Sequence, residues 1–371
     1  MISIDLMSEN IRVFCSHKTW LEGDALNQFR NVCALPGFVR GAAYPDLHPG
    51  HGIPVGTAYL FRETIYPFLI GGDIGCGMNL SMSDLPVHKW KPDRALRRLT
   101  DDPEYVIRHR ARELCVQEEH PDDPAHQLGT LGRGNHFAEI LAVDSIMDPD
   151  RFSAWKLNSK HLFLLIHSGS RSYGERFASR FTAVHGAEGL SPDSESGQAY
   201  LAGHDRLIHW ARYNRRLSAQ AFHSLLGSKG TEVLDSVHNR IERMSSGLWL
   251  HRKGAAEART GEPVLIAGTR GSSSYLVAPK EVSEETLFSL AHGAGRKWTR
   301  LSTRSRIQAK YREEELRRTP IGSHVLCPDR DLLCEEAPDA YKNIEQVIQD
   351  LTDFHLIDVV ASFRPLLNCK P

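Results

Sequence analysis

Short apolar runs along the chain predict several buried strands. The clearest run covers residues 161–166, and residues 263–267 and 275–277 have a similar character. Runs of this length, bounded by turn-forming residues, are typical of strands buried in a sheet. Residues 66–70 form another such run, and a last strand is expected to pass through residue 359. Strands are therefore expected at several separate places along the chain.

Helical spacing of apolar residues alternates with these strands. Residues 198–226 combine apolar positions with four arginines, a pattern typical of a long amphipathic helix with one basic face. Residues 93–119 and 344–351 also have helical spacing, and a helix is expected to begin near His292 and to run to about residue 318. The mixture of strands and helices predicts the α+β class.

Turn-forming residues separate these elements. Residues 36–60 are rich in glycine and proline, which indicates turns rather than regular structure. The acidic, proline-containing residues 118–124 are interpreted as a surface loop. No repeat, low-complexity block or linker interrupts the chain, so we expect a single domain over residues 1–371.

The composition excludes several classes of protein. With 371 residues, 41% of them hydrophobic and 25% charged, the chain can bury a large core. The seven cysteines are scattered, with no Cys-x-x-Cys pair, and the N-terminus lacks a signal pattern, so we expect a reducing cytoplasm. No apolar run approaches the ~20 residues needed to span a bilayer, and we expect no membrane insertion.

The net charge of -1 allows a nucleic-acid partner only at a local basic surface. Residues 296–318 are one candidate, with nine basic and three acidic side chains. The arginines Arg206, Arg212, Arg215 and Arg216 of the expected long helix are another candidate. A solvated helix face is the alternative interpretation of both.

A candidate metal site begins with Asp73 and Cys76, a carboxylate and a thiol three residues apart among glycines. An Asp and a Cys with this spacing, without other ligands, more often have a structural role. His136, His167 and His238, however, have Gly, Ser or Asn neighbours, which suit the turns and hydrogen bonds that orient ligand imidazoles. A thiolate in such a set can bridge two divalent ions. By itself, the combination of Cys, His and Asp favours zinc.

A second group of residues favours phosphate chemistry. His292 is followed by Gly293, Ala294, Gly295 and Arg296. At a helix N-terminus, the glycine amides would form an anion site, to which the arginine adds a two-pronged donor. The imidazole could attack phosphorus, because it is a good nucleophile when neutral and also a good leaving group.

Two further polar groups have both a functional and a structural interpretation. Asn135, beside His136, could donate a hydrogen bond to a phosphate oxygen. Asp46 and His48 could pair to orient a ligand or a substrate phosphate, and a purely structural role is about equally expected.

The order of these motifs resembles that of RtcB-type RNA ligases. The matching motifs are Pro45-Asp46-Leu47-His48, Gly72-Asp73-Ile74-Gly75-Cys76-Gly77-Met78, Gly129-Thr130-Leu131-Gly132-Arg133-Gly134-Asn135-His136-Phe137, His167-Ser168-Gly169-Ser170-Arg171, His238-Asn239 and His292-Gly293-Ala294-Gly295-Arg296. The resemblance implies one RtcB-like domain with mixed sheets flanked by helices and a central cleft for two metal ions. It also implies an RNA ligase of RNA repair or tRNA splicing. Such a ligase joins 2',3'-cyclic phosphate or 3'-phosphate ends to 5'-hydroxyl ends, with GTP and manganese, through a guanylylated histidine.

The resemblance also assigns the site residues. Two manganese ions would be held by Asp73, Cys76, His136, His167 and His238, with Cys76 as the bridge. His292 would be the catalytic nucleophile that takes GMP. The nucleotide contacts would be Asn135, Glu139, Ser274, Gly293, Ala294, Gly295, Arg296, Tyr341 and Lys370. Manganese in the family overrides the preference of this ligand set for zinc.

Several alternatives remain open. The chain is shorter than typical RtcB-type ligases and resembles a second bacterial branch encoded beside a release-factor-like protein, which would be an operon partner. A two-metal phosphoesterase or nuclease without nucleotide activation would use the same metal ligands, but it would not need His292 or Lys370. A non-catalytic RNA-binding paralogue is a third class, which the retention of every candidate ligand disfavours.

Overall fold

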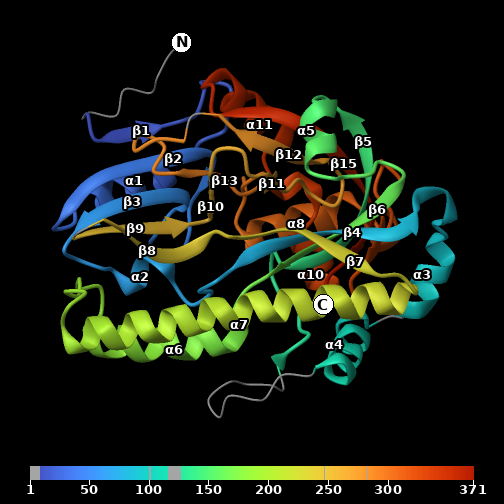
Figure 1. The fold of residues 1–371 in the computed structure, drawn as a ribbon, viewed down its shortest axis with the longest axis horizontal. Coiled ribbons are helices and arrows are strands. Elements are labelled where there is room, and N and C mark those ends of the chain that lie inside the picture. The colour runs from blue at the N-terminus through green and yellow to red at the C-terminus, as the bar shows by residue number, and fades with distance from the viewer. Residues whose placement is uncertain (1–8, 100–101, 116–126, 246, 281) are drawn as a thin grey trace.

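Helices pack around mixed sheets in this protein, which confirms the predicted α+β class (Figure 1). The computed structural model describes residues 9–99, 102–115, 127–245, 247–280 and 282–371. A five-stranded sheet has the order β1 (Ile11–Val13), β2 (Phe38–His48), β3 (Val55–Arg62), β9 (Leu248–Lys253) and β8 (Asn239–Ser245). A larger sheet has the order β11 (Val264–Ile266), β12 (Ser274–Pro279), β15 (Ile357–Cys369), β5 (Phe137–Ile146), β6 (His161–Ser168), β4 (Gly77–Pro86) and β7 (Gly230–Val237), with β14 (His324–Leu326) paired to β15. A separate pair consists of β10 (Ala255–Glu257) and β13 (Ser289–Ala291).

Both large sheets combine parallel and antiparallel pairing. The strands β1 and β2 are parallel, as are β14 and β15, whereas β2 pairs antiparallel with β3 and β5 with β15. The helices are α1 (Gly23–Cys33), α2 (Pro67–Ile70), α3 (Pro92–Leu99), α4 (Pro103–Leu114), α5 (Pro149–Ala154), α6 (Arg171–His185), α7 (Glu195–Leu226), α8 (Arg300–Lys310), α9 (Glu313–Leu316), α10 (Arg330–Glu335) and α11 (Ile344–Asp353).

The predicted strand over residues 161–166 is confirmed as β6, and both faces of this strand are buried. Leu162, Leu164 and Ile166 pack into one hydrophobic cluster, and Phe163 and Leu165 pack into another. A strand covered on both faces needs no polar alternation, which explains its continuous apolar run. The predicted strands in β11 and β12 and the predicted helix α11 are also confirmed.

Helix α7 confirms the prediction of a long helix over residues 198–226. The Ser194 hydroxyl accepts a hydrogen bond from the Gly197 amide at its start, and Gly227 ends it in the left-handed conformation. The helix runs below both sheets in the view of Figure 1 and contacts β4, β6, β7 and β8. It therefore spans the two sheets and supports the ends of strands in each.

The prediction that Arg215 belongs to an exposed basic face is wrong. Its side chain is fully buried, whereas those of Arg212 and Arg216 are 38% and 57% exposed. The Arg215 guanidinium donates hydrogen bonds to both carboxylate oxygens of Asp235 and to the carbonyls of Gly75 and Ser168. The helical spacing places Arg215 on the polar face of the helix. In the structure, however, the Asp235 carboxylate and the carbonyls of Gly75 and Ser168 give each guanidinium nitrogen a hydrogen-bond partner, which allows the side chain to be buried.

Other expectations from turn formers and short runs are also wrong. Residues 36–60 contain the strands β2 and β3 rather than mainly turns. Residues 66–70 contain the short helix α2, because Pro67 is well suited to a first helical turn and a short apolar run does not distinguish a strand from a buried helix.

Two predicted helices begin or end elsewhere. Residues 93–119 contain α3 and a separate α4, which starts at Pro103 with an Asp102 cap. The helix expected from His292 begins only at Arg300, where Thr299 caps α8.

The last strand, expected through residue 359, extends to Cys369. The surface loop expected at residues 118–124 lies outside the described residues.

Candidate metal and nucleotide site

The register of the larger sheet brings four candidate ligands to one edge. Gly77, at the start of β4, pairs with Ser168 at the end of β6 and with Val237 at the end of β7. Phe137, at the start of β5, pairs with His167 on β6. Cys76, His136 and His238 are the residues next to these strand ends, and His167 lies on the same edge. Antiparallel pairing thus gathers segments that are far apart in sequence.

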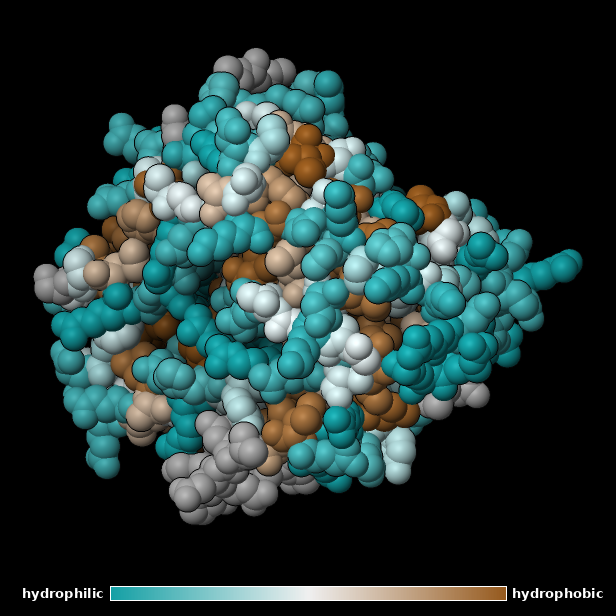
Figure 2. Space-filling view, turned by 45° about the vertical axis from the view of Figure 1, so that its right-hand side comes forward, coloured by the Kyte–Doolittle hydropathy of each residue, from teal (hydrophilic) through white to brown (hydrophobic). Residues whose placement is uncertain are grey.

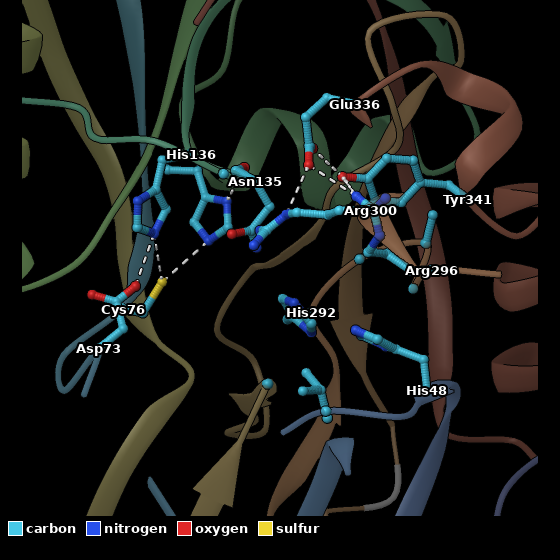
Figure 3. Close-up of a pocket in the computed structure, with 18 of the residues that line it drawn as sticks. His48, Asp73, Cys76, Asn135, His136, His292, Arg296, Arg300, Glu336 and Tyr341 are labelled. Atoms are coloured by element: carbon cyan, nitrogen blue, oxygen red, sulfur yellow. Dashed lines mark hydrogen bonds and ion pairs between the residues drawn. The ribbon is translucent and has the colours of Figure 1, made fainter. Parts of the chain in front are cut away.

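The side chains at this edge converge on a buried thiol. The Sγ atom of Cys76 lies 3.3 Å from Nε2 of His136 and 3.3 Å from Nε2 of His167. Nε2 of His167 lies 3.4 Å from Nε2 of His238, and Asp73 Oδ2 lies 2.9 Å from Nε2 of His136 (Figure 3). The ligand atoms of Cys76, His136 and His167 thus lie within 4.8 Å of one another, with His238 beside His167 and Asp73 beside His136.

The protonation chemistry of this cluster fits a divalent cation. Burial raises the pKa of the Cys76 thiol well above its usual range, and Asp73 adds to the effect, so a nearby cation is needed to stabilise the thiolate. Burial also lowers the pKa values of His167 and His238, which keeps both imidazoles neutral and able to ligate. The second oxygen of Asp73, Oδ1, is buried without a hydrogen-bond partner. These donors fit a thiolate and imidazole metal centre.

The imidazole of His292 lies beside this cluster, directly after β13. Its ring centroid is 4.5 Å from that of His238. Its Nδ1 is 2.7 Å from Asp46 Oδ2, within ion-pair distance although not aligned as a hydrogen bond, and its backbone amide donates to the same oxygen at 3.2 Å. Asp46 therefore faces the Nδ1 side of the ring, and Nε2 is the ring nitrogen on the other side.

Asp46 and His48 meet through the backbone, because His48 Nδ1 contacts the Asp46 carbonyl oxygen at 2.8 Å, while the Asp46 carboxylate faces His292. The expected helix N-terminus at Gly293 and Gly295 is absent from the described residues, because α8 begins at Arg300. Gly295 has a φ of +72°, and a Cβ atom on it would lie 2.3 Å from the Asp46 carbonyl oxygen. The glycine thus allows this segment to pack against the strand that bears Asp46.

A cleft of about 990 Å³ connects these groups. It is lined by every candidate site residue except Glu139 and Ser274, namely Asp73, Cys76, Asn135, His136, His167, His238, His292, Gly293, Ala294, Gly295, Arg296, Tyr341 and Lys370. Its size is at the upper end of the range for ligand sites, which suits a nucleotide.

The two remaining candidates are buried in the walls around the cleft. Glu139, on β5, accepts a hydrogen bond from Asn368 at 2.8 Å, and burial raises its pKa to about 8. The Ser274 hydroxyl accepts a hydrogen bond from the Gly268 amide at 3.0 Å. Both side chains are occupied by contacts with neighbouring protein groups.

Glu336, which follows α10 and also lines the cleft, was not among the site residues predicted from the sequence. Its carboxylate contacts Arg296 at 2.9 Å and Lys370 at 3.4 Å, and it accepts a hydrogen bond from the Tyr341 hydroxyl (Figure 3). Its position five residues before Tyr341 was the available signal. No local pattern, however, showed that the distant Arg296 and Lys370 would meet there.

These features define a class: an α+β protein with a buried thiol and imidazole cluster that could hold a metal ion, beside a further histidine in a nucleotide-sized cleft. The family model for RtcB, described as tRNA-splicing ligase RtcB, matches residues 28–113 and 106–371. The protein belongs to the RtcB family.

Similarity to individual relatives covers nearly the whole chain. The protein is 40% identical to "RNA-splicing ligase RtcB2" of Escherichia coli, over 98% of this chain and 96% of that one. It is 29% identical to "tRNA-splicing ligase RtcB" of Archaeoglobus fulgidus, over 93% of this chain and 91% of that one. The protein of the same name from Thermococcus kodakarensis is 27% identical over 92% and 90%.

Proposed function

We propose that this protein is a GTP- and manganese-dependent RNA ligase that joins 2',3'-cyclic phosphate or 3'-phosphate ends to 5'-hydroxyl ends. The observation that supports the proposal best is the position of His292. Its imidazole lies 4.5 Å from that of His238, centroid to centroid, and lines the same cleft as Arg296, Tyr341 and Lys370. A phosphoesterase could use the cluster, but it would need no nucleophile held in this way.

In this proposal two metal ions would be held by Asp73, Cys76, His136, His167 and His238, and the Cys76 thiolate would be shared between them. Bound manganese ions would stabilise the charge that develops on attacking and leaving oxygens. We prefer manganese to zinc because the chain belongs to the RtcB family. The donor set alone would favour zinc.

The nucleotide step follows from the position of the His292 ring. Asp46 holds the Nδ1 side, and Nε2 attacks the α-phosphorus of GTP. A nitrogen–phosphorus bond forms as the bond to the leaving pyrophosphate breaks. Arg296, the adjacent glycine amides and Asn135 are the proposed phosphate contacts. Glu139, Ser274, Tyr341 and Lys370 are proposed to contact the guanine nucleotide.

The RNA steps transfer the same GMP group. Water first opens a cyclic phosphate where one is present. A 3'-phosphate oxygen then attacks the GMP phosphorus and releases His292. Finally, the 5'-hydroxyl attacks the activated 3'-phosphorus and expels GMP.

The surface around the site is compatible with an RNA strand. In Figure 2 the visible face is mostly hydrophilic, with hydrophobic side chains scattered over it. Arg300 and Arg304 of α8 are 48% and 41% exposed, and Arg300 lines the cleft. Exposed arginines of this kind can pair with RNA phosphates. The buried Arg215 is removed from this proposed surface.

Three further features belong to the proposal. Residues 1–371 would form one catalytic domain, because segments of both large sheets line the cleft. The cytoplasm is the proposed location, since all seven cysteines are free thiols. The close match in length with RtcB2 supports the shorter branch, with a release-factor-like operon partner. No helix in the described ranges is long and apolar enough to cross a membrane.

Mass spectrometry after incubation with GTP and manganese tests the nucleotide step. The wild-type protein should gain a covalent GMP group, and His292→Ala should gain none while it still binds metal. An adduct on the alanine variant would place the nucleophile elsewhere.

Defined RNA ends test the ligation step. A 3'-phosphate or cyclic phosphate strand should join to a 5'-hydroxyl strand, with one GMP released per junction, whereas a 3'-hydroxyl strand should not join to a 5'-phosphate strand. Strand cleavage without joining would favour the phosphoesterase.

A further inference from the structure

Glu336 is a buried carboxylate among cations that line the cleft. Its side chain is 1% exposed. Oε1 lies 2.9 Å from an Arg296 nitrogen and 3.7 Å from Nε of Arg300, and Oε2 lies 3.4 Å from Nζ of Lys370. The Tyr341 hydroxyl donates to Oε2. Figure 3 shows the carboxylate pointing toward the labelled arginines and tyrosine.

The charges around Glu336 leave this wall of the cleft positive. One carboxylate faces three cations, Arg296, Arg300 and Lys370. Burial alone raises the pKa of the Glu336 carboxyl, but Lys370 and Arg296 outweigh burial and hold it at about 2. The group is therefore ionised at working pH. It reduces the repulsion between the cations, and an excess of positive charge remains for an anionic ligand.

The hydrogen bonds to Glu336 also fix the direction of each partner. The only hydroxyl proton of Tyr341 is donated to Glu336, so this oxygen offers lone pairs to other groups. Arg296 is held by Glu336 and by the carbonyls of Trp298 and Glu335. Lys370 donates to the carbonyls of Gly134 and His136 as well. Within the described part of the chain, Glu336 is the group that these three side chains all contact.

We infer that Glu336 is a positioning residue for the nucleotide, acting through Arg296, Tyr341 and Lys370 rather than by touching the reacting phosphorus. The inference rests on the proposed function, since it takes GTP as the ligand of this wall. An anionic side chain does not bind a triphosphate directly, but it orders the donors that do. Its removal therefore weakens GTP binding even though the site gains positive charge.

Calorimetric titration of the full-length protein with GTP tests this inference. Glu336→Gln keeps the size of the side chain but removes its charge, and it should raise the GTP dissociation constant about tenfold, the scale of one lost charge-assisted hydrogen bond. Glu336→Asp keeps the charge and should raise it less. The matched control is Glu335→Gln, the same change at the preceding residue, which should leave the constant unchanged.

The amount of adduct separates positioning from a general loss of structure. At saturating GTP, and well below its melting temperature, Glu336→Gln should reach the wild-type adduct level. The melting temperature itself should fall, because the change leaves buried cations without their charged partner. A variant that only destabilised the fold would instead show a lower level at every GTP concentration. Equal or tighter GTP binding by Glu336→Gln would overturn the inference. If that variant does not fold, Glu336→Asp with wild-type affinity would overturn it equally.

Failure of the proposed function gives a different result. If GTP binds the wild-type protein without any adduct, the proposed ligase chemistry fails, and the comparison of dissociation constants still decides the role of Glu336. If GTP does not bind the wild-type protein at all, both proposals fail together.

Discussion

Replacement of Arg215 by methionine tests the structural role of the most deeply buried arginine of α7. The change keeps a long side chain but removes the guanidinium. Four hydrogen bonds disappear: two to Asp235, at 3.0 and 2.6 Å, one to the Gly75 carbonyl at 2.7 Å and one to the Ser168 carbonyl at 2.8 Å. The two carbonyls belong to residues that precede Cys76 and follow His167, so the arginine also braces two ligand segments.

The expected cost is large because a carboxylate is left behind. Asp235 has a side chain that is only 9% exposed, and loss of one partner from a buried ion pair costs about 3–5 kcal/mol. Arg212, at 3.6 Å, and Asn79, at 3.4 Å, remain near this carboxylate. We therefore expect the lower end of the range, about 3 kcal/mol. Asp235→Asn added to Arg215→Met should recover part of the loss, since it removes the unpaired charge.

Equilibrium unfolding in urea measures this effect against a neighbouring control. Arg216→Met removes an exposed arginine whose contact with Glu232, at 3.4 Å, should contribute only about 0–1 kcal/mol. The role assigned to Arg215 would be refuted if the two single variants differed by less than about 1 kcal/mol. RNA binding should change with Arg216→Met only if the exposed face of α7 contacts RNA.

Further predictions concern the proposed reaction centre. Asp46→Asn should slow adduct formation about 10- to 100-fold at saturating GTP, and an unchanged rate would show that His292 needs no such support. Cys76→Ala should lose both metal ions together in elemental analysis, and one fully retained ion would exclude a bridging thiolate. Metal affinity should rise with pH, because burial keeps the Cys76 thiol protonated without a cation and binding must release that proton. A pH-independent dissociation constant would contradict this.

The sequence was sufficient to predict which candidate ligands lie close together where a motif lies next to a strand end. Cys76, His136 and His238 lie beside strand ends that the sheet register brings together, so motif order anticipated their meeting. The fold class and α7 were also correctly predicted, because a long helical pattern is a strong signal.

Partners that meet only through tertiary packing could not be predicted. Arg215 has the spacing of an exposed helix face, and its burial depends on Asp235 and on two carbonyls from other strands. Glu336 resembles any acidic residue after a helix until Arg296 and Lys370 come together around it. The prediction of a strand at residues 66–70 was wrong for a different reason, since apolar residues in a short run suit a buried helix as well as a strand.

Asp46 and Lys370 are far apart in the sequence, and this separation has a consequence for folding kinetics. The cleft is lined by residues from β2, near the start of the chain, and by the residue that follows β15, near its end. The contact of His292 with Asp46 of β2, for example, closes a loop of 246 residues. Such non-local contacts form slowly, and until they form, Cys76 and the histidines are separate soft donors. A thiol and imidazoles in an unfolded chain can bind zinc without the geometry that selects a metal. Zinc supplied during refolding is therefore expected to be trapped, whereas manganese added after folding meets a completed site.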